Sequence, residues 1–413
     1  MELFDVTTVK GFRDYLPPES LIRERITKIA KEVYKKYGFL PVETPVIEFD
    51  ELMRPDTPND EDEAVADRFR LKDRGGRNLG LRYEFTFQLA RIFKENPNIK
   101  LPFRRYQIGT VFRDEPIRLG RTRQFTQCDA DIVGDESILA DADCLAMVSE
   151  IFSEIGIKDI EVKVNNRKLL NAIVESVEID AKQQVLRELD KLEKLGPDEV
   201  KLNLKKYAST NQILTLFKLL EKNLEFMRQN AFEGAVELEE LIQLAGSMGV
   251  KVTFSPTLVR GFSYYTGNIF EVVKGGKSAL AGGGRYDKSI GKYSNRQISA
   301  VGISFSLEAL MGICAEELAK LPKEQTTKTV LISIGQDETA LKLANKLRSS
   351  NISLIMFQGK PGKALEYADA YSIPYAIFLG EEEIEKKKLK LRDLSSGAES
   401  MLTEAQVLKK LQK

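Results

Sequence analysis

Residues 112–129 read FRDEPIRLGRTRQFTQCD, and this stretch decides the fold that we expect for the chain. A strand-like run ends at its first residue, a polar loop carries Arg118, Arg121 and Arg123, and a second strand-like run follows. Arginines on a hairpin can clamp a polyphosphate through paired N–H groups. Phe125, at the start of the second run, can stack on a purine. A nucleotide-binding hairpin is therefore expected, and a solvated arginine-rich hairpin is the alternative.

The segments on either side extend this pattern. Residues 79–134 alternate apolar runs with arginine-rich loops, which predicts an antiparallel sheet with a helix at 88–93. Apolar residues at helical spacing predict a helix over 19–37. Leucines at helical spacing and a low glycine content predict that 167–248 form a helical insertion, and the sheet is expected to resume at 251–274.

The end of the chain has a different organisation. A polar linker is predicted near 321–328. Beyond it, strand and helix patterns alternate, which predicts a small parallel α/β domain. The expected domains are therefore 1–320, interrupted by the helical insertion, and 329–413.

Composition restricts the possible chemistry. The 413 residues carry equal numbers of basic and acidic side chains, so any contact with RNA must come from local patches. The chain contains no histidine, which excludes Ser-His-Asp catalysis and imidazole metal sites. Catalysis must depend on carboxylates, arginine, lysine, tyrosine, backbone groups and a metal bound through oxygen atoms. Phosphoryl or nucleotidyl transfer, which needs mainly positioning and charge neutralisation, is the leading candidate.

Three cysteines, Cys128, Cys144 and Cys314, lie far apart and form no CxxC pair. We expect buried free thiols and no structural zinc site. Residues 1–10 lack the apolar core of a secretory signal, and no apolar run approaches the roughly 20 residues of a membrane span. A cytoplasmic location is therefore expected, with no membrane partner.

Residues 257–271, TLVRGFSYYTGNIFE, form the most specific motif. Arg260 precedes a glycine, so its guanidinium can approach a bound phosphate. We expect Tyr264 and Tyr265 to lie on opposite faces of a strand, so that only one points into a given pocket. The glycines of GGGRYD at 282–287 allow close backbone approach to a substrate.

These motifs, together with GFRDYLPPE at 11–19, LGLRYEFT at 79–86 and QCDADIVG at 127–134, resemble the histidyl-tRNA synthetases, a family of class II aminoacyl-tRNA synthetases. The segment at 36–47 is similar to class II motif 1, a dimer interface, and the hairpin at 112–129 to motif 2. The last domain resembles the anticodon-binding domain of this subgroup. The resemblance covers nearly the whole chain.

The resemblance implies an α+β catalytic domain with an antiparallel sheet flanked by helices, a helical insertion and a C-terminal α/β anticodon-binding domain. It also implies the activity of a histidine–tRNA ligase, which activates histidine with ATP to histidyl-adenylate and transfers it to the 3′ end of tRNA(His). The implied cofactor is Mg²⁺, with ATP as a substrate. The implied partners are histidine, tRNA(His) and a second copy of the chain, with no DNA.

By the same resemblance, the substrate α-ammonium would be held by Glu84, Thr86 and Gln127. Asp131 and Tyr264, beside Tyr265, would bind the imidazole. A ring with two nitrogens needs polar partners on both sides, and an unmatched buried polar group penalises other amino acids by about 1 kcal/mol or more.

For the nucleotide, the family's catalytic α-phosphate ligands correspond to Arg113 and Arg260. Arg121 and Arg123 would reach the outer phosphates with Mg²⁺, and no metal site made of protein groups alone is expected. Phe125 would stack on the adenine, while Glu115 would accept a hydrogen bond from its amino group. The amino-acid carboxylate is itself the nucleophile, so no general base is required.

Motif 3 departs from the class pattern GxGxGΦER, in which Φ is apolar. The chain reads GISFSLEAL at 302–310, with Ser304 and Ser306 in place of glycines and Ala309 in place of the arginine that contacts adenine and γ-phosphate. Two alternatives to a working ligase therefore remain. One is a histidine-sensing regulatory subunit of ATP phosphoribosyltransferase, and the other is a tRNA-binding module without catalysis.

Overall fold

The structure is a computed structural model that describes residues 6–53, 67–118, 120–260, 264–275, 278–293, 296–321 and 327–412. The chain divides into two compact units, Met1–Leu321 and Pro322–Lys413. Most of the predicted linker near 321–328 falls outside the described residues.

An eight-stranded sheet forms the centre of the first unit, in the order β1-β5-β6-β11-β10-β9-β7-β8. The pairings β1–β5 and β7–β8 at the two edges are parallel, and the others are antiparallel, so the predicted antiparallel sheet is confirmed. The strands are β1 Leu40–Pro41, β5 Phe103–Phe112, β6 Gln124–Val133, β7 Ile160–Asn166, β8 Val252–Phe254, β9 Asn268–Lys274, β10 Ser278–Arg285 and β11 Ala300–Ser306.

A second, three-stranded sheet has the order β2-β4-β3. Its strands are β2 Ile47–Phe49, β3 Arg70–Lys72 and β4 Asn78–Leu81, and the short helices η1 Asp50–Met53 and α3 Thr86–Glu95 adjoin it. Two prolines, Pro41 and Pro45, lie at the end of β1 and in the segment between β1 and β2. The chain therefore leaves the large sheet after β1 and enters the small sheet at β2.

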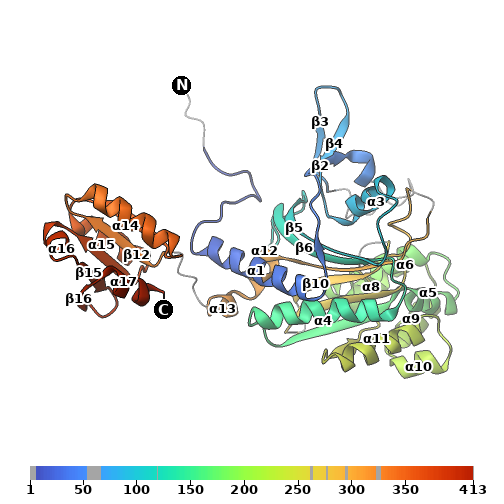
Figure 1. Cartoon of the computed structure of the whole chain (residues 1–413). Helices are drawn as coiled ribbons and strands as arrows, with labels where there is room; N and C mark the ends of the chain where they lie inside the picture. Colours follow the sequence, from blue (N-terminus) through green and yellow to red (C-terminus); the bar gives the residue numbers. More distant parts are fainter. Residues whose placement is uncertain are drawn as a thin grey trace. The chain divides into compact units, whose positions relative to one another are not determined.

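Helices cover one face of the large sheet. Helix α4 (Ile138–Glu154) packs on β6, β10 and β11, with α1 (Glu19–Lys36) and α11 (Ala235–Ser247) beside it (Figure 1). Alternate residues of β6, Cys128, Ala130 and Ile132, are fully buried in this core. The intervening residues of β6 must therefore project from the opposite face of the sheet.

The predicted helical insertion is confirmed. It comprises α5 Arg167–Ser176, α6 Lys182–Leu189, α7 Leu192–Leu195, α8 Pro197–Leu204, α9 Thr210–Leu220, α10 Leu224–Gln229 and α11. Ser209 begins α9 with a capping box closed by Gln212, a local signal for a helix start. After β11 the chain continues into α12 (Leu307–Ile313) and α13 (Ala315–Leu318).

The second unit contains a five-stranded sheet in the order β13-β12-β14-β15-β16. The predicted parallel arrangement holds for β12, β13 and β14, whereas β15 and β16, which the sequence patterns did not reveal, pair antiparallel. The connection after β14 is too short for the crossover that a further parallel strand needs. The elements are β12 Thr329–Ser333, α14 Asp337–Ser349, β13 Leu354–Gln358, α15 Pro361–Ala370, β14 Tyr375–Leu379, α16 Glu381–Glu385, β15 Leu389–Asp393, β16 Glu399–Leu402 and α17 Glu404–Leu411.

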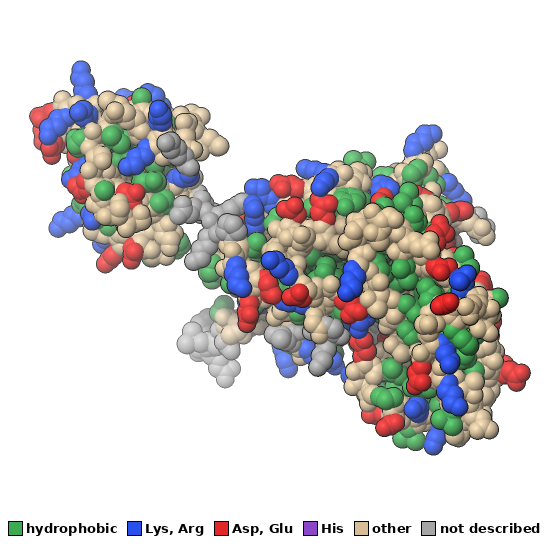
Figure 2. All heavy atoms as spheres, turned by 90° about the horizontal axis from the view of Figure 1, so that it is seen from below, with side chains coloured by type: hydrophobic (Ala, Val, Ile, Leu, Met, Phe, Trp, Pro, Cys, Tyr) green, Lys and Arg blue, Asp and Glu red, His purple; other side chains and the backbone are tan. Residues whose placement is uncertain are grey.

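The surface reflects the balanced composition. On the face drawn in Figure 2, basic and acidic side chains are interspersed, and no extended field of one sign covers it. Cys128, Cys144 and Cys314 are buried free thiols, as expected. Within the described ranges, no helix combines the length and apolar character needed to cross a membrane.

The separate core of the second unit gives the first prediction. Leu331 on the interior strand β12 is fully buried, so Leu331→Ala should destabilise this unit by about 2–5 kcal/mol through lost burial and a cavity. Hydrogen exchange measured peptide by peptide during urea unfolding should show the loss within 327–412 alone. Leu341→Ala, at a position that is 53% exposed, is the matched control. Equal effects of the two substitutions would contradict the prediction.

Candidate active site

A cavity of about 280 Å³ opens on the face of the large sheet opposite α4. Side chains from β6, β10 and β11, from the loop before β9 and from the β5–β6 hairpin line it. The cavity brings together all but one of the predicted site residues, namely Glu84, Thr86, Arg113, Glu115, Arg121, Phe125, Gln127, Asp131, Arg260, Tyr264 and Tyr265.

Strand β6 supplies the floor of the cavity. Gln127, Asp129 and Asp131 are two residues apart and therefore share a face, and each is less than a tenth exposed. Across the strand pair, Ser304 lies opposite Asp129 and Gly302 lies opposite Asp131. A β-carbon at Gly302 would collide with the Asp131 carboxylate. The glycine of GISFS therefore makes room for that carboxylate.

Asp131 is held from two sides. The Arg105 guanidinium on β5 lies 2.6 Å from its carboxylate, and only 1% of the Arg105 side chain is exposed. The Tyr286 hydroxyl donates a hydrogen bond to its other oxygen. Burial raises the pKa of Asp131, and Arg105 opposes this shift. The carboxylate is thus fixed in position before any ligand arrives.

Glu84 and Asp129 are held less completely. Burial raises the pKa of each carboxyl to about 7, against partial opposition from Arg113 and Arg105 respectively. The Tyr264 hydroxyl donates to Glu84 Oε2 at 3.3 Å. Glu84 Oε1, Asp129 Oδ1 and Gln127 Oε1 are buried without a hydrogen-bond partner. These oxygens form an acceptor site that fits an N–H cation.

Arginines gather elsewhere along the same cavity. The Arg113 guanidinium lies over the Tyr83 ring at 4.3 Å and over the Phe125 ring at 5.0 Å. Arg121 lies on the hairpin loop, with its side chain 68% exposed. Guanidinium groups placed in this way fit the oxygens of a polyphosphate.

Arg260 reaches the cavity through an unusual backbone conformation. Its φ is 51°, in the left-handed region, and its guanidinium pairs with Glu271 at 2.7 Å. A β-carbon at Gly282 would collide with this guanidinium, so the glycine of GGGRYD is needed there. Residues 261–263 of the motif lie outside the described residues.

The expectation for the two adjacent tyrosines is wrong. Tyr264 and Tyr265 precede β9, which begins at Asn268, and so no strand alternation separates them. Both line the cavity, with ring centroids 4.9 Å apart and planes inclined by 55°. A turn can place consecutive side chains in one pocket, whereas a strand cannot.

Arg123 is the predicted site residue that the structure does not place among the residues lining the cavity. Its guanidinium lies 3.1 Å from Asp114, and its Nε donates to the Glu115 carbonyl at 3.3 Å. Its backbone N–H donates to the Gly11 carbonyl at 2.9 Å. In this structure Arg123 ties the segment around residue 11 to the hairpin.

The departure in motif 3 has a structural counterpart. Gly120, with a φ of 70°, lies in the turn of the hairpin loop, and a β-carbon on it would lie 3.2 Å from the Ala309 Cα atom. The turn therefore packs directly against the start of α12. The neighbouring Glu308 is held by Arg23 at 2.9 Å and by the Thr126 N–H at 2.8 Å. The small side chain at 309 lets the loop that carries Arg121 approach this closely.

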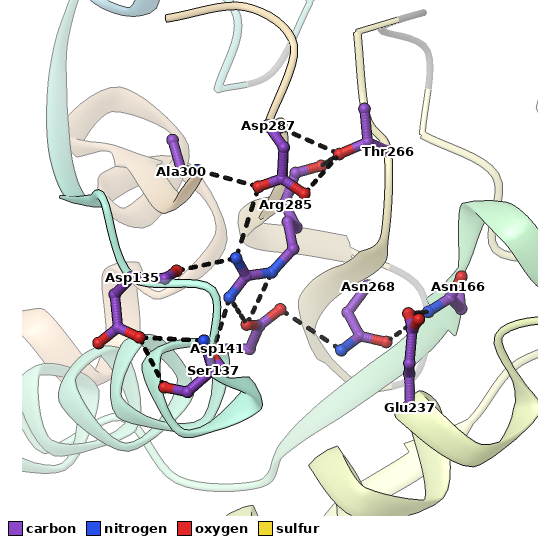
Figure 3. Close-up of polar contacts among 10 residues, drawn as sticks. All are labelled: Asp135, Ser137, Asp141, Asn166, Glu237, Thr266, Asn268, Arg285, Asp287 and Ala300. Carbon is purple, nitrogen blue, oxygen red and sulfur yellow. Dashed lines mark hydrogen bonds and ion pairs between the residues drawn. The ribbon is translucent and has the colours of Figure 1, made fainter. Parts of the chain in front are cut away.

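A buried polar network supports the cavity from behind (Figure 3). Arg285, at the end of β10, pairs with Asp141 of α4 and donates to the carbonyls of Asp135 and Ser137, both at 2.9 Å. Burial raises the pKa of Asp141 to about 6, and Arg285 opposes the shift. Because Tyr286 follows Arg285, this anchor also fixes the backbone that carries the hydroxyl bound to Asp131.

The same network reaches the helical insertion (Figure 3). Asn268 donates to Asp141 at 3.4 Å, and Asn166 donates to Asn268 at 2.9 Å and to Glu237 of α11 at 3.0 Å. On the cavity side, the Thr266 N–H donates to the Arg285 carbonyl at 2.8 Å. The insertion and the tyrosine segment are therefore joined through buried hydrogen bonds.

Three of the ionisable residues that line the cavity, Asp129, Glu271 and Tyr286, were not predicted as site residues. Arg105, which pairs with Asp131, was not predicted either. The alternation in QCDAD places Asp129 on the same face as Gln127 and Asp131, and Tyr286 belongs to GGGRYD. For Asp129 and Tyr286, the local sequence pattern therefore indicated a position at the site. The pairings of Arg105 and Glu271 depend on strand register, which the sequence patterns did not provide.

Comparisons with known proteins agree with this geometry. A family model for histidyl-tRNA synthetase matches residues 11–310, and a model for an anticodon binding domain matches 328–413. Histidine--tRNA ligase 1 of Bacillus cereus is 36% identical over 417 residues, covering 96% of this chain and 94% of the relative. The crystal structure of histidyl-tRNA synthetase from Nostoc sp. PCC 7120 is 28% identical, with a TM-score of 0.85 and 99% of both chains covered.

One further neighbour shares the fold. It is a Bacillus halodurans structure described as an ATP phosphoribosyltransferase regulatory subunit/histidyl-tRNA synthetase, 23% identical, with a TM-score of 0.75. The match covers 92% of this chain and 99% of that one. At this identity the likeness shows the fold alone.

The raised pKa of Glu84 predicts a pH dependence of stability. A carboxyl whose pKa is about 7 in the folded protein, above its ordinary value of 4.5, stabilises the fold below pH 4.5 and loses that contribution as pH rises through 7. Glu84→Gln should therefore stabilise the ligand-free protein by up to about 3 kcal/mol at pH 8, and by much less at pH 5. Urea unfolding at the two pH values measures the difference.

Glu95→Gln, at an exposed carboxylate of α3, is the control for this comparison and should change stability by less than about 0.5 kcal/mol at either pH. A Glu84→Gln effect of equal size at pH 5 and pH 8 would show that the carboxyl is not protonated on folding.

Proposed function

Because the chain belongs to the histidyl-tRNA synthetase family, we propose that its cavity is where histidine and ATP react to form histidyl-adenylate. The chain is an aminoacyl-tRNA synthetase, and its activity is histidine–tRNA ligation. This assignment rests on one observation: the cavity contains both a site of hydrogen-bond acceptors and a site of positive charge. Buried acceptor oxygens without partners lie in the same cavity as three guanidinium groups.

We assign the acceptor site to the amino acid. Glu84, Thr86 and Gln127 hold the α-ammonium, and the unpartnered oxygens of Glu84 and Gln127 support this role. Asp131 binds the imidazole together with Tyr264 and Tyr265. Its fixation by an ion pair and a hydroxyl supports selection by shape and hydrogen bonding, because a rigid acceptor penalises a ligand that lacks the matching N–H.

The first step is an in-line displacement at the α-phosphorus of ATP. The histidine carboxylate attacks, an acyl–phosphate bond forms, and the bond to pyrophosphate breaks. Arg113 and Arg260 donate to the α-phosphate oxygens, where negative charge develops, and their position in the cavity lining supports this role. Arg121 accounts for the outer phosphates, and Arg123 serves to hold the hairpin. In the second step the 3′ hydroxyl of tRNA attacks the acyl carbon and AMP leaves.

The adenine fits beside Phe125. The Arg113 guanidinium lies over one face of this ring. Glu115 lines the same region and can accept from the adenine amino group. In the described part of the chain, no cluster of three or more potential metal ligands occurs. This fits a Mg²⁺ ion held mainly by the triphosphate, with Glu115 and Glu271 as the nearby carboxylates. When bound, the ion neutralises phosphate charge.

Partners follow from the two units. The second unit matches an anticodon binding domain, which supports binding of tRNA(His). The segment resembling motif 1 and the residues just after it leave apolar side chains exposed, including Leu40, Ile47 and Phe49, each about half exposed. Such a patch supports a homodimer interface. We assign the enzyme to the cytoplasm, where tRNA charging supplies the ribosome.

The regulatory-subunit alternative is less well supported. The chain retains the anticodon-binding unit, and the Bacillus halodurans neighbour carries only a likeness of fold. A tRNA-binding module without catalysis has no use for acceptor oxygens and arginines in one cavity. Histidine–tRNA ligation uses both units and both ends of the cavity.

Pyrophosphate exchange tests the proposed function. Purified protein with ATP and labelled pyrophosphate should incorporate label into ATP when histidine is present, and not with any of the other 19 amino acids. Charging of tRNA(His) transcript with labelled histidine then tests the second step. Binding of histidine without exchange at saturating ATP would instead favour the regulatory alternative.

The contact between Gly120 and Ala309 predicts an effect on ATP use. Ala309→Arg should raise the KM for ATP by about tenfold, about 1.4 kcal/mol, because the longer side chain displaces the turn that carries Arg121. The KM for histidine should change less than twofold. Ala309→Gly keeps the turn in place and is the control. A lower KM for ATP in Ala309→Arg would contradict the prediction, because the restored arginine would then help to bind ATP without displacing the turn that carries Arg121.

A further inference from the structure

Strand β6 presents three polar side chains to the cavity, and the proposed function uses only two of them. Gln127 and Asp131 have partners in the substrate, whereas Asp129, between them, has none assigned. Asp129 is 5% exposed and its Oδ1 atom has no hydrogen-bond partner. A buried carboxylate without a full set of partners costs stability, so its presence calls for a physical reason.

We propose that Asp129 is a further ligand for the α-ammonium of histidine and acts together with Glu84 as a carboxylate pair. The inference deepens the proposed function and depends on it. A substrate cation between two carboxylates gains charge-assisted hydrogen bonds from both sides.

The geometry leaves one oxygen of Asp129 available. The Gln127 side-chain N–H donates to Asp129 Oδ2 at 3.1 Å, which orients the carboxylate. Gln127 Oε1, Asp129 Oδ1 and Glu84 Oε1 are buried acceptors without a hydrogen-bond partner, and all three residues line the same cavity. Asp131 Oδ2 also has no hydrogen-bond partner, but it forms an ion pair with Arg105. An ammonium group has three N–H bonds, and these three acceptors can satisfy them.

Asp131 is a poorer candidate for the same task. One of its oxygens already accepts from Tyr286, and the other lies 2.6 Å from Arg105. That ion pair compensates its charge. The same Arg105 also lowers the pKa of Asp129, but the nearby charge of Asp131 raises it. The charge of Asp129 therefore remains available to an incoming cation.

The groups facing Asp129 come from several elements. Arg105 lies on β5, Gln127 and Asp131 lie on β6, and Ser304 lies opposite on β11. The charge of Asp129 raises the pKa of Glu84, just before α3, and of Tyr34 on α1. Among these groups, Arg105 is the cation, and it already pairs with Asp131.

This arrangement links histidine binding to proton release. Burial raises the pKa values of Glu84 and Asp129 to about 7, so the empty pair holds protons near neutrality. A bound ammonium favours the charged forms and displaces those protons. Histidine affinity should therefore increase as pH rises from 6 to 8.

Asp129→Asn tests the assignment, since it keeps the shape and removes the charge. The KM for histidine in pyrophosphate exchange should rise by about tenfold or more, and the KM for ATP should stay within twofold. The melting temperature of the ligand-free variant should be equal to or above that of the wild type, because a buried uncompensated charge is gone. Asp143→Asn, at a partly exposed carboxylate of α4 paired with Arg104, is the matched control and should change neither constant.

A ligand without the amine distinguishes a role of Asp129 at the ammonium end of the pocket from a role at the imidazole end. Calorimetric titration with 3-(imidazol-4-yl)propionate, which keeps the ring and the carboxylate, should give equal affinity for wild type and Asp129→Asn. Titration with histidine at pH 7 in buffers of different ionisation enthalpy should show less proton release by the variant. The protons of free histidine contribute equally to both proteins and cancel in the difference.

Several results would overturn the assignment. An unchanged KM for histidine would remove Asp129 from the site. A lowered melting temperature with equal rises in both KM values would show a merely structural role. Equal weakening of the amine-free ligand would place Asp129 at the imidazole. Failure of the wild type itself to bind or activate histidine would refute the proposed function, and the inference would fall with it.

Discussion

The register between β6 and β11 is the constraint on which the rest of the site depends. It places Gly302 opposite Asp131 and Ser304 opposite Asp129, so that a strand with small residues faces a strand with acidic ones. A shift by one residue would turn Gln127, Asp129 and Asp131 into the apolar core and bring Cys128, Ala130 and Ile132 into the cavity. The fully buried contacts of these three apolar residues with the helical face oppose such a shift. Hydrophobic burial on one side of the sheet thus holds the polar site on the other.

Much of this fold was predictable because its signals are local. The period of two in residues 124–133, the leucine spacing of the insertion and the strand–helix alternation after residue 329 each specify an element without tertiary information. The hairpin arginines could be assigned to a nucleotide site from the local pattern, whereas Gln127 and Asp131 were assigned to the substrate site through the family resemblance and Asp129 was not assigned. Membership of a family added roles to these positions but did not alter where the patterns place them.

The failures share a different cause, because each depends on where an element begins or on which partner a residue or strand contacts, and periodicity specifies neither. Tyr264 and Tyr265 were assigned to a strand, but the chain reaches β9 only at Asn268. Arg123 belongs to an arginine-rich loop, yet Asp114 and the backbone at Gly11 draw its side chain aside. Strands β15 and β16 pair antiparallel, because the connection after β14 is too short for a parallel crossover. Periodicity carries no information about such partners.

The cavity contains no imidazole of its own, since the chain has no histidine anywhere. In the proposed reaction, carboxylates hold the substrate amine, guanidinium groups bind the phosphates and the substrate carboxylate is the nucleophile, so no imidazole from the protein is needed. The absence of histidine has a consequence for the synthesis of the enzyme itself. A ribosome translating this chain never requires histidyl-tRNA, the product that the enzyme makes. When that product runs short, synthesis of the enzyme that restores it does not stall at a histidine codon.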